Sequence, residues 1–390
     1  MNAGAARPGQ AREMPRKAPI SRPAPQIKRP GGSQPPEARS GGRHIIIALV
    51  ILGIAVFLIG LGIKSCVAGK TAGTPDTADR AAVPAQMSAP AGASSADTAP
   101  DTEKPDEKIV DNSGRTVLAP YRDSSSASFD PAIDSEYGIM VERGTGRIVA
   151  RRDPDAKVYP ASLTKVMSLI VAVENCGSLD DTLTFTNAII DPVFRQGASM
   201  AGFDNGETVT LRDMLYGMIL PSGADAAEGI CICVAGDDEH FVALMNEKAK
   251  ELGLKKTHFA NASGLHDPEQ YSTCTELAII LDYAIQDPTC RTVLSTYKYT
   301  TAPTEQHPEG IELTSDLQAR MEGGESGVAR ILGGKTGYVT ESKYCLATFA
   351  RADADGREYV IVTCMGSGRW KPIFDHINIC KKYIGGLSIE

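Results

Sequence analysis

One uncharged apolar segment divides this chain and determines which part of it can fold as a globular domain. Residues 45–63 contain no charged side chain and consist mainly of Ile, Leu, Val, Ala, Gly and Phe. A helix of this length crosses the hydrocarbon core of a bilayer. A cleavable signal peptide is the alternative, but the run is long for one and no clear cleavage site with small residues follows it. We therefore predict an uncleaved transmembrane helix over residues 45–64.

The segments on either side of this helix do not have the composition of a folded domain. Residues 1–44 carry nine Arg or Lys residues against two Glu and are rich in Pro and Gly, which predicts a disordered basic tail. Positive charge ahead of the span places the N-terminus in the cytoplasm and the rest of the chain outside it. Residues 65–133 are mostly Ala, Ser, Thr, Asp and Pro, which is typical of a linker.

The remaining residues, 134–390, hold the candidate catalytic domain. Their acidic balance argues against a nucleic acid as ligand. Eight cysteines occur here, most of them inside apolar stretches where a free thiol is an ordinary core group, although disulfides are the alternative outside the cytoplasm. No C-x-x-C pair is present, so we expect no structural zinc and no other cofactor.

Hydrophobic periodicity in this region predicts a mixture of strands and helices. An early hairpin is followed by several helices, then by two strands and a closing helix, an order that indicates an α+β fold with one mostly antiparallel sheet flanked by a helical subdomain. The predicted strands are 137–141, 147–150, 344–350 and 359–365, and the predicted helices are 161–174, 210–219, 224–235, 240–252, 275–286 and 371–383.

A hydroxyl and an amine stand three residues apart at the start of the first predicted helix. If that helix begins at Pro160, Ser162 and Lys165 lie on one face of it. Serine is a poor nucleophile until a neighbouring base takes its proton, and a lysine removed from water can be that base. Backbone N–H groups at the helix start would stabilise an oxyanion. The pair is therefore a candidate nucleophile and base.

A second candidate, Ser222, falls in the predicted break between two helices. A serine in such a loop can point into a cleft, and the alternative is that it caps the helix that follows.

A third candidate motif precedes the strand predicted at 344–350. Residues 333–338 read Gly-Gly-Lys-Thr-Gly-Tyr, in which Lys335 offers a fixed cation and Thr336 a hydroxyl to an anionic ligand. A phosphate-binding loop is the rival interpretation. It is disfavoured because the glycine spacing of that motif is absent and a strand, not a helix, follows.

Taken together, the ordered motifs S-x-x-K, S-x-x and K-T-G resemble those of the active-site serine penicillin-recognising enzymes. The chain resembles in particular the low-molecular-mass D-alanyl-D-alanine carboxypeptidases, peptidase family S11, over about residues 134–383. The matching segments are 160–165 (PASLTK), 206–210 (GETVT), 214–217 (MLYG), 221–227 (PSGADAA), 261–265 (NASGL) and 335–340 (KTGYVT).

This resemblance implies a function and a role for each motif residue. The protein would be a membrane-anchored bacterial enzyme, with its catalytic domain outside the cytoplasm, that removes the terminal D-alanine from peptidoglycan stem peptides and is inhibited by β-lactams. Ser162 would be the nucleophile, Lys165 its base and Ser222 a proton relay. The substrate would be bound by Lys335, Thr336, Gly337 and Tyr338, and the backbone N–H groups of Ser162 and Tyr338 would form the oxyanion hole.

Two departures from the family pattern stand out. Ala224 occupies the place where the family usually has an asparagine, whose amide helps hold the substrate and the lysine. Losing one such polar partner costs about 1–3 kcal/mol, and Asp225 is a candidate to compensate for it. The predicted anchor also precedes the domain, whereas many family members carry a C-terminal anchor.

Other functions stay open at this point. A weakly catalytic or non-catalytic protein that binds penicillin or wall peptide is the main alternative, because Ala224 replaces the usual asparagine. A β-lactamase would need a glutamate motif for deacylation, which we do not find. A zinc peptidase is conceivable from His258, His266 and Asp267, but no helical H-E-x-x-H is present.

Overall fold

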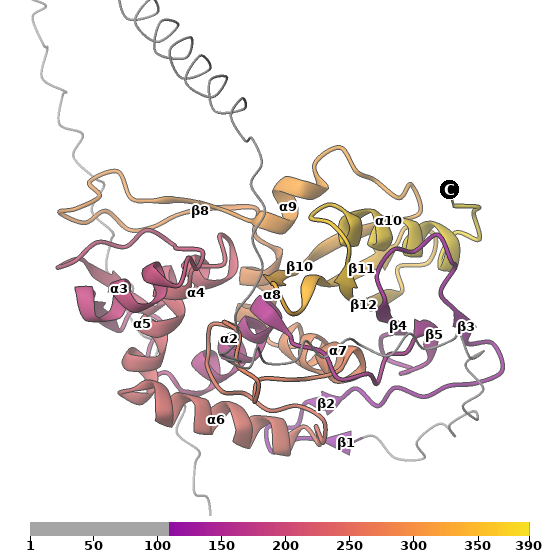
Figure 1. Cartoon of the computed structure of the whole chain (residues 1–390), viewed down its shortest axis with the longest axis horizontal. Coiled ribbons are helices and arrows are strands. Elements are labelled where there is room, and N and C mark those ends of the chain that lie inside the picture. The colour runs from indigo at the N-terminus through magenta and orange to yellow at the C-terminus, as the bar shows by residue number, and fades with distance from the viewer. Residues whose placement is uncertain (1–108, 390) are drawn as a thin grey trace, which may run out of the picture. The chain divides into compact units, whose positions relative to one another are not determined.

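The computed structural model describes residues 109–389 (Figure 1). The predicted basic tail, the predicted transmembrane helix and the first part of the predicted linker lie outside the described residues, so the structure does not bear on them. Among the helices within residues 109–389, none has both the length and the hydropathy needed to cross a bilayer.

A six-stranded sheet forms the framework of the domain, with strand order β10-β11-β12-β4-β5-β3. Neighbouring strands are antiparallel except for the outer pair β3–β5, which is parallel. The fold is therefore α+β with a mostly antiparallel sheet, as predicted. The strands are β3 (Ala127–Ser128), β4 (Tyr137–Glu142), β5 (Ile148–Arg152), β10 (Ala329–Val339), β11 (Lys343–Ala352) and β12 (Glu358–Gly366).

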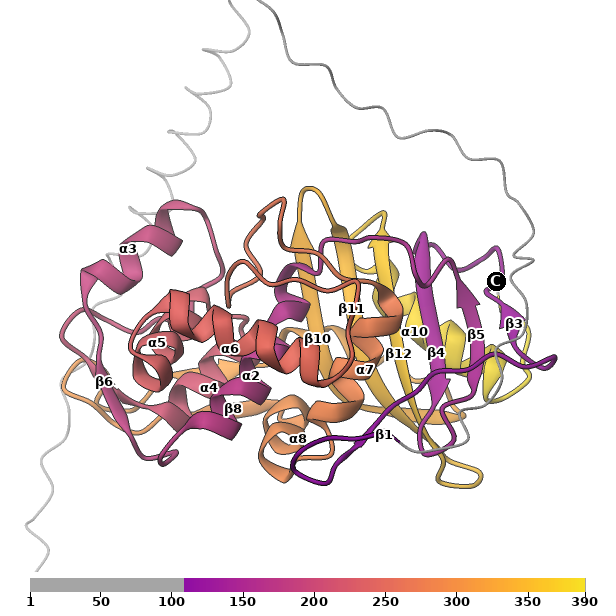
Figure 2. The same ribbon diagram turned by 90° about the horizontal axis from the view of Figure 1, so that it is seen from below.

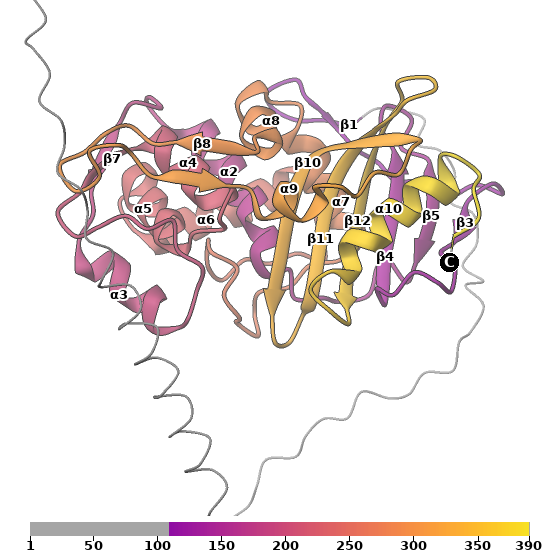
Figure 3. The same ribbon diagram turned by 90° about the horizontal axis from the view of Figure 1, so that it is seen from above.

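Both faces of this sheet are covered by helices. In β4, Ile139 and Val141 pack into the larger core with α7 (Cys274–Ala284), while Met140 between them packs into a second core with Ile379 of α10 (Lys371–Tyr383). Figure 2 shows α7 in front of the sheet, and Figure 3, from the opposite side, shows α10 in front of it. Burial on both faces explains why these strands read as continuous apolar runs.

The remaining helices gather at the β10 end of the sheet (Figure 2). At their centre α2 (Thr164–Asn175) follows the 3₁₀ turn η1 (Ala161–Leu163), and every residue from Thr164 to Ala172 is buried. This confirms the helix predicted over residues 161–174, whose first turn is η1. Around it lie α3 (Asn187–Arg195), α4 (Leu211–Ile219), α5 (Ala224–Ala235), α6 (Asp238–Glu251), α8 (Pro288–Ser295) and the hairpins β6 (Thr182–Thr184) with β7 (Thr208–Thr210) and β8 (Lys298–Thr300) with β9 (Glu312–Thr314). The short helix α9 (Asp316–Met321) packs elsewhere, because its Leu317 meets Leu346 of β11 and Ile373 of α10.

Strand β10 was not among the predicted strands. Residues 333–338 were placed only ahead of the strand predicted at 344–350, but they lie inside β10 and pair with β11, Lys335 opposite Ala347. Glycine and lysine have low strand propensity, so this segment carries little local strand signal. Its pairing with the apolar β11 outweighs that weakness.

The folded region also begins earlier than the boundary predicted at residue 134. Two short strands, β1 (Ile109–Val110) and β2 (Thr116–Val117), pair with each other, and β3 joins the main sheet. The side chains of Val117, Leu118, Phe129 and Ile133 are buried. Isolated apolar residues among Asp, Ser and Arg resemble a linker in composition, and only their contacts with the core reveal that they belong to the domain.

The cysteines of the described residues are free thiols. Cys176 and Cys233 are partly exposed, and the others are buried, namely Cys231, Cys274, Cys290, Cys345, Cys364 and Cys380. They therefore pack as small core groups, the first of the two alternatives raised by the sequence.

Candidate active site

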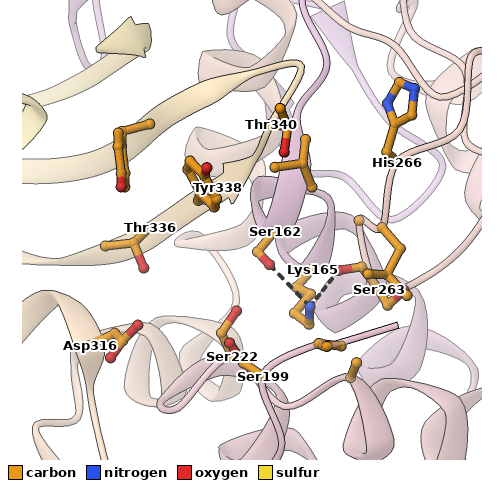
Figure 4. A pocket seen from close by; sticks show the side chains of 18 of the residues that line it. Ser162, Lys165, Ser199, Ser222, Ser263, His266, Asp316, Thr336, Tyr338 and Thr340 are labelled. Atoms are coloured by element: carbon orange, nitrogen blue, oxygen red, sulfur yellow. Dashed lines mark hydrogen bonds between the residues drawn. The ribbon is translucent and has the colours of Figure 1, made fainter. Parts of the chain in front are cut away.

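A cleft of about 670 Å³ lies where the start of α2, the α4–α5 connection, the loop after α6 and strand β10 meet (Figure 4). Six of the seven residues proposed from the motifs line it: Ser162, Lys165, Ser222, Thr336, Gly337 and Tyr338. The seventh, Lys335, is buried directly behind the cleft and donates a hydrogen bond to one of its lining residues, Ser222. The fold thus brings together three motifs that are far apart in the sequence.

Ser162 lies in the tight turn η1 and not in an α-helix beginning at Pro160. The preceding Ala161 has a φ of 48°, in the left-handed region that non-glycine residues rarely adopt. Two glycines press on this turn: a Cβ on Gly264 would lie 2.0 Å from the Ala161 carbonyl oxygen, and one on Gly337 would lie 3.3 Å from the Ser162 nitrogen. A side chain at Gly264 is therefore excluded, and one at Gly337 would push the strand away from the turn.

Lys165 is positioned as a base for Ser162. Its Nζ lies 3.2 Å from Ser162 Oγ and also donates a hydrogen bond to the backbone carbonyl of Ser263. The side chain is 2% exposed. Burial, together with the positive charge of Lys335, lowers the pKa of Lys165 to about 7, partly offset by the acids Glu228 and Asp225. A large fraction of Lys165 is therefore uncharged near neutral pH.

Ser222 and Lys335 form a second pair on the other side of the cleft. Lys335 Nζ donates to Ser222 Oγ at 2.9 Å and to the backbone carbonyl of Thr336 at 3.0 Å. Burial lowers the pKa of Lys335 to about 8. The alternative that Ser222 caps the next helix is wrong, because Gly223 occupies the N-cap of α5 and no side chain bonds there. Ser222 itself has a φ of 66°, a strained conformation that directs its side chain toward Lys335.

The residue at the position of the usual asparagine faces the cleft. Ala224 lines it, and its backbone N–H donates to the carbonyl of Ser199 at 2.7 Å. Asp225 does not replace the missing amide, because its carboxylate accepts hydrogen bonds from the backbone N–H groups of Ala201 at 2.7 Å and Gly202 at 3.0 Å. Asp225 instead fixes the segment that forms the adjacent wall of the cleft.

Several groups in the cleft were not identified from the sequence. Arg320 and Arg369 line it, and Arg320 pairs with Asp316, which lines it too, at 3.0 Å. These residues belong to no local motif and are brought together only by the fold. Ser263 holds Lys165 through its backbone carbonyl. Every residue has such a carbonyl, so no pattern of side chains in the sequence points to this contact.

Within residues 109–389 no three His, Cys, Asp or Glu side chains converge as metal ligands would. His258, considered for a zinc site, bonds to the backbone carbonyl of Glu269 at 2.7 Å, and His266 lies at the rim of the cleft, 3.7 Å from Glu341.

Comparison with known proteins gives a consistent result. The family model for peptidase S11, D-alanyl-D-alanine carboxypeptidase, matches residues 124–368. The chain is 32% identical over 250 residues to a D-alanyl-D-alanine carboxypeptidase of Streptomyces sp. strain K15, which covers 62% of this chain and 84% of that protein. It is 29% identical over 220 residues to the carboxypeptidase DacF of Bacillus subtilis, covering 56% of this chain and 55% of the relative, so only about half of that protein's length is spanned.

Solved structures agree with these sequence matches. The crystal structure of the Streptomyces K15 DD-transpeptidase superposes with a TM-score of 0.58 at 30% identity and covers 66% of this chain and 100% of that one. A D-alanyl-D-alanine carboxypeptidase from Mycobacterium tuberculosis H37Rv superposes with a TM-score of 0.56 at 25% identity, covering 67% and 96% of the two chains.

Proposed function

The chain belongs to the D-alanyl-D-alanine carboxypeptidase family, peptidase S11, and we propose that it is a serine-type enzyme that removes the terminal D-alanine from peptidoglycan stem peptides through an acyl-enzyme. The observation that carries this proposal is the contact of 3.2 Å between Ser162 Oγ and Lys165 Nζ, in which the lysine is buried and has a pKa of about 7. A lysine in that state can accept the serine proton at neutral pH.

In the acylation step, Ser162 Oγ attacks the carbonyl carbon between the two terminal D-alanines and its proton passes to Lys165 Nζ. The resulting oxyanion accepts hydrogen bonds from the backbone N–H groups of Ser162 and Tyr338. The close approach of Gly337 to the Ser162 nitrogen supports this pairing of strand and turn.

Collapse of this intermediate requires a proton on the leaving amine. Ser222 accepts a hydrogen bond from the Lys335 ammonium, so its own hydroxyl proton is available to the departing D-alanine nitrogen as the C–N bond breaks. The proton that Lys165 took from Ser162 then returns to Ser222 Oγ, which leaves Lys165 neutral again. In the second step water attacks the acyl carbon and gives a proton to Lys165, and Lys165 passes it to Ser162 Oγ as the shortened peptide leaves. The carboxylate of the substrate meets the cationic end of the cleft, formed by Lys335, Thr336 and Arg369.

We also infer that the enzyme acts outside the cytoplasm, anchored by the apolar residues 45–64. The basic tail before this segment and the family's substrate, a component of the cell wall, support that location. β-Lactams present a carboxylate and a strained amide, so they should acylate Ser162.

A second candidate function is a receptor that binds penicillin or wall peptide with little turnover. It is favoured by Ala224, which brings no amide to the cleft, and by Asp225, whose carboxylate is held by the backbone N–H groups of Ala201 and Gly202.

The test is D-alanine release from a stem pentapeptide by the full-length protein, beside fluorescent-penicillin labelling. We expect both to occur and both to disappear in Ser162→Ala, while the exposed turn residue Ser178, changed to Ala, serves as the matched control and keeps them. Labelling without release would favour the receptor function. Labelling that persists in Ser162→Ala would refute the assignment of the nucleophile.

A further inference from the structure

We propose that Asp316, held in place by Arg320, is a specificity-determining residue that weakens the attraction of the cleft for the terminal carboxylate of its substrate. The inference rests on the proposed function, because it concerns the end of the cleft that would receive this carboxylate. Both residues lie on the short helix α9, outside the three motifs.

A backbone hydrogen bond fixes the start of α9 beside the α4–α5 connection. The N–H of Asp316 donates to the carbonyl of Leu220 at 3.0 Å, and Leu220 stands two positions before Ser222. The next residue of the helix, Leu317, is buried against the sheet and α10. Asp316 is therefore held on the Ser222 side of the cleft from both of its ends, by a backbone contact and by the packing of its neighbour.

The carboxylate of Asp316 faces the cleft. Figure 4 shows its side chain beside those of Thr336 and Ser222, whereas His266 lies on the far side of Ser162. The side chain of Asp316 is 40% exposed, so a ligand in the cleft can approach it. An anionic group of the protein thus stands at the end of the cleft where the proposed function places the anion of the substrate.

Arg320 fixes the position of this carboxylate. The two residues are four positions apart on α9, a spacing at which side chains meet on one face of a helix. Arg320 Nη2 donates to Asp316 Oδ2 at 3.0 Å, and the arginine side chain is 14% exposed and lines the cleft as well. Partial burial of the pair shields it from solvent screening, so its charges act on the cleft more strongly than those of a fully exposed pair.

Asp316 also interacts with the other cations at this end of the cleft. Burial lowers the pKa of Lys335 to about 8, and the charge of Asp316 opposes this shift, whereas Arg320 adds to it. Burial likewise lowers the pKa of Arg320, which Asp316 opposes and Arg369 reinforces. The positive charge that would attract a substrate carboxylate is therefore already partly neutralised by an acid of the protein.

This arrangement has a consequence for the choice of substrate. A free carboxylate entering this end is attracted by the cations and repelled by Asp316, and two like charges about 6 Å apart change an equilibrium by about threefold even in water. A ligand whose carboxylate is masked as an ester or an amide is subject to neither effect. Asp316 therefore makes the cleft less selective for a free terminal carboxylate than its cations alone would make it.

The experiment compares acylation of the full-length protein by benzylpenicillin, which has a free carboxylate, and by its neutral methyl ester, at low ionic strength. The rates are measured in competition with fluorescent penicillin, and the result is the ratio of the acid rate to the ester rate. Asp316→Asn should raise this ratio by about threefold or more, and Arg320→Gln should lower it by a similar factor. The double variant should return close to the unmodified protein, because a neutral pair then replaces an ion pair.

Asp191→Asn is the matched control. Asp191 pairs with Arg195 at 2.8 Å over the same spacing on α3, and neither of them lines the cleft. The ratio in this variant should equal that of the unmodified protein. An unchanged or lower ratio in Asp316→Asn would overturn the inference, and a lower ratio would show that the acid only holds Arg320 in place for the ligand. An equal rise in the control would also overturn it, because the effect would then come from the net charge of the domain.

A second measurement separates this inference from the proposed function. Binding of N-acetyl-D-alanyl-D-alanine and of its C-terminal amide is followed by NMR titration in Ser162→Ala, which cannot form an acyl-enzyme, with and without Asp316→Asn. The acid should bind about threefold more tightly or better once Asp316 is replaced, and the affinity for the amide should stay the same. Equal affinities for the acid would refute the inference even if the unmodified enzyme releases D-alanine. The expected gain in affinity without D-alanine release would refute only the proposed function.

Discussion

At the scale of single residues, the candidate site depends on positions with a small side chain or none as much as on the reactive residues. Gly264 and Gly337 lie against the turn that carries Ser162, and Ala224 leaves the wall of the cleft without an amide. These positions determine how closely the backbone can surround a substrate.

Gly337→Ala should slow acylation by about tenfold or more. The added Cβ would lie 3.2 Å from the Pro160 carbonyl oxygen and 3.3 Å from the Ser162 nitrogen, so β10 and the turn must separate, and overpacking of this kind costs about 1–3 kcal/mol. The measurement is the rate of penicillin labelling together with the melting temperature. Gly177→Ala is the control, because that glycine is exposed and only the Asp181 side chain is near. An unchanged labelling rate in Gly337→Ala would contradict the prediction.

Ala224→Asn should accelerate acylation by up to about tenfold, because the amide side chain can form a hydrogen bond with the substrate in the cleft. One such hydrogen bond contributes about 0.5–1.5 kcal/mol. The backbone hydrogen bond from residue 224 to Ser199 does not depend on the side chain and is retained. Ala224→Val adds volume without polar atoms and should give no gain. Slower acylation by the asparagine variant at an unchanged melting temperature would show that the cleft is adapted to alanine.

At the scale of secondary-structure elements, α10 is attached to the sheet through a buried histidine. His376 is fully buried, with Nδ1 2.7 Å from Thr348 Oγ1 on β11 and Nε2 3.1 Å from Thr363 Oγ1 on β12. Burial lowers the pKa of this imidazole to about 3. The packing of the helix on the sheet therefore favours the neutral ring.

The free energy of unfolding of the domain should consequently fall as the pH decreases, because the unfolded chain protonates His376 more readily than the folded one does. The folded-state pKa lies below the unfolded value of about 6.5, so the unfolded chain binds the proton first. The contribution is fully present above pH about 6.5 and is lost as the pH falls toward about 3, at up to about 1.4 kcal/mol per pH unit. Denaturant unfolding at several pH values, compared with His376→Gln, measures it. The variant should show a shallower dependence, and equal slopes would contradict the assignment.

At the scale of the whole domain, an ion-pair cluster joins its helical part to its sheet. Glu358 on β12 pairs with Arg291 on α8 at 2.6 Å and with Arg351 on β11 at 2.7 Å, and it also pairs with Arg143. Despite partial burial, these arginines lower the pKa of Glu358 to about 2. The carboxylate thus stays ionised throughout the pH range in which the enzyme is proposed to act.

Residues 109–133 also pack on the domain. A chain that begins at residue 134 should therefore be much less stable than one that begins at 109. It would lose β1, β2 and β3 and four buried apolar side chains, Val117, Leu118, Phe129 and Ile133. Burying one such side chain contributes about 1.5–3 kcal/mol. Thermal unfolding of both chains provides the measurement. A chain starting at residue 124 keeps Phe129 and Ile133 and should fall between them, whereas equal melting temperatures would show that the segment only rests on the surface.

The sequence by itself determined the parts of this protein that are encoded locally. Hydrophobic periodicity predicted the hairpin β4–β5, the helices α2, α4, α5, α6, α7 and α10 and the strands β11 and β12, because each pattern of 3.6 or 2 residues lies within one element. The order and spacing of S-x-x-K, S-x-x and K-T-G predicted the family and the set of residues now found around one cleft. The transmembrane helix over residues 45–64 stays a prediction.

Only the tertiary structure decided the contacts and charge states of the site. Ser222 meets Lys335 across 113 positions of sequence, and Lys165 is held by a carbonyl 98 positions away. Strand β10 forms because β11 pairs with it. The physical reason is common to all of them: hydrogen bonds, burial and pKa values depend on neighbours in space, which a local pattern of residues does not specify.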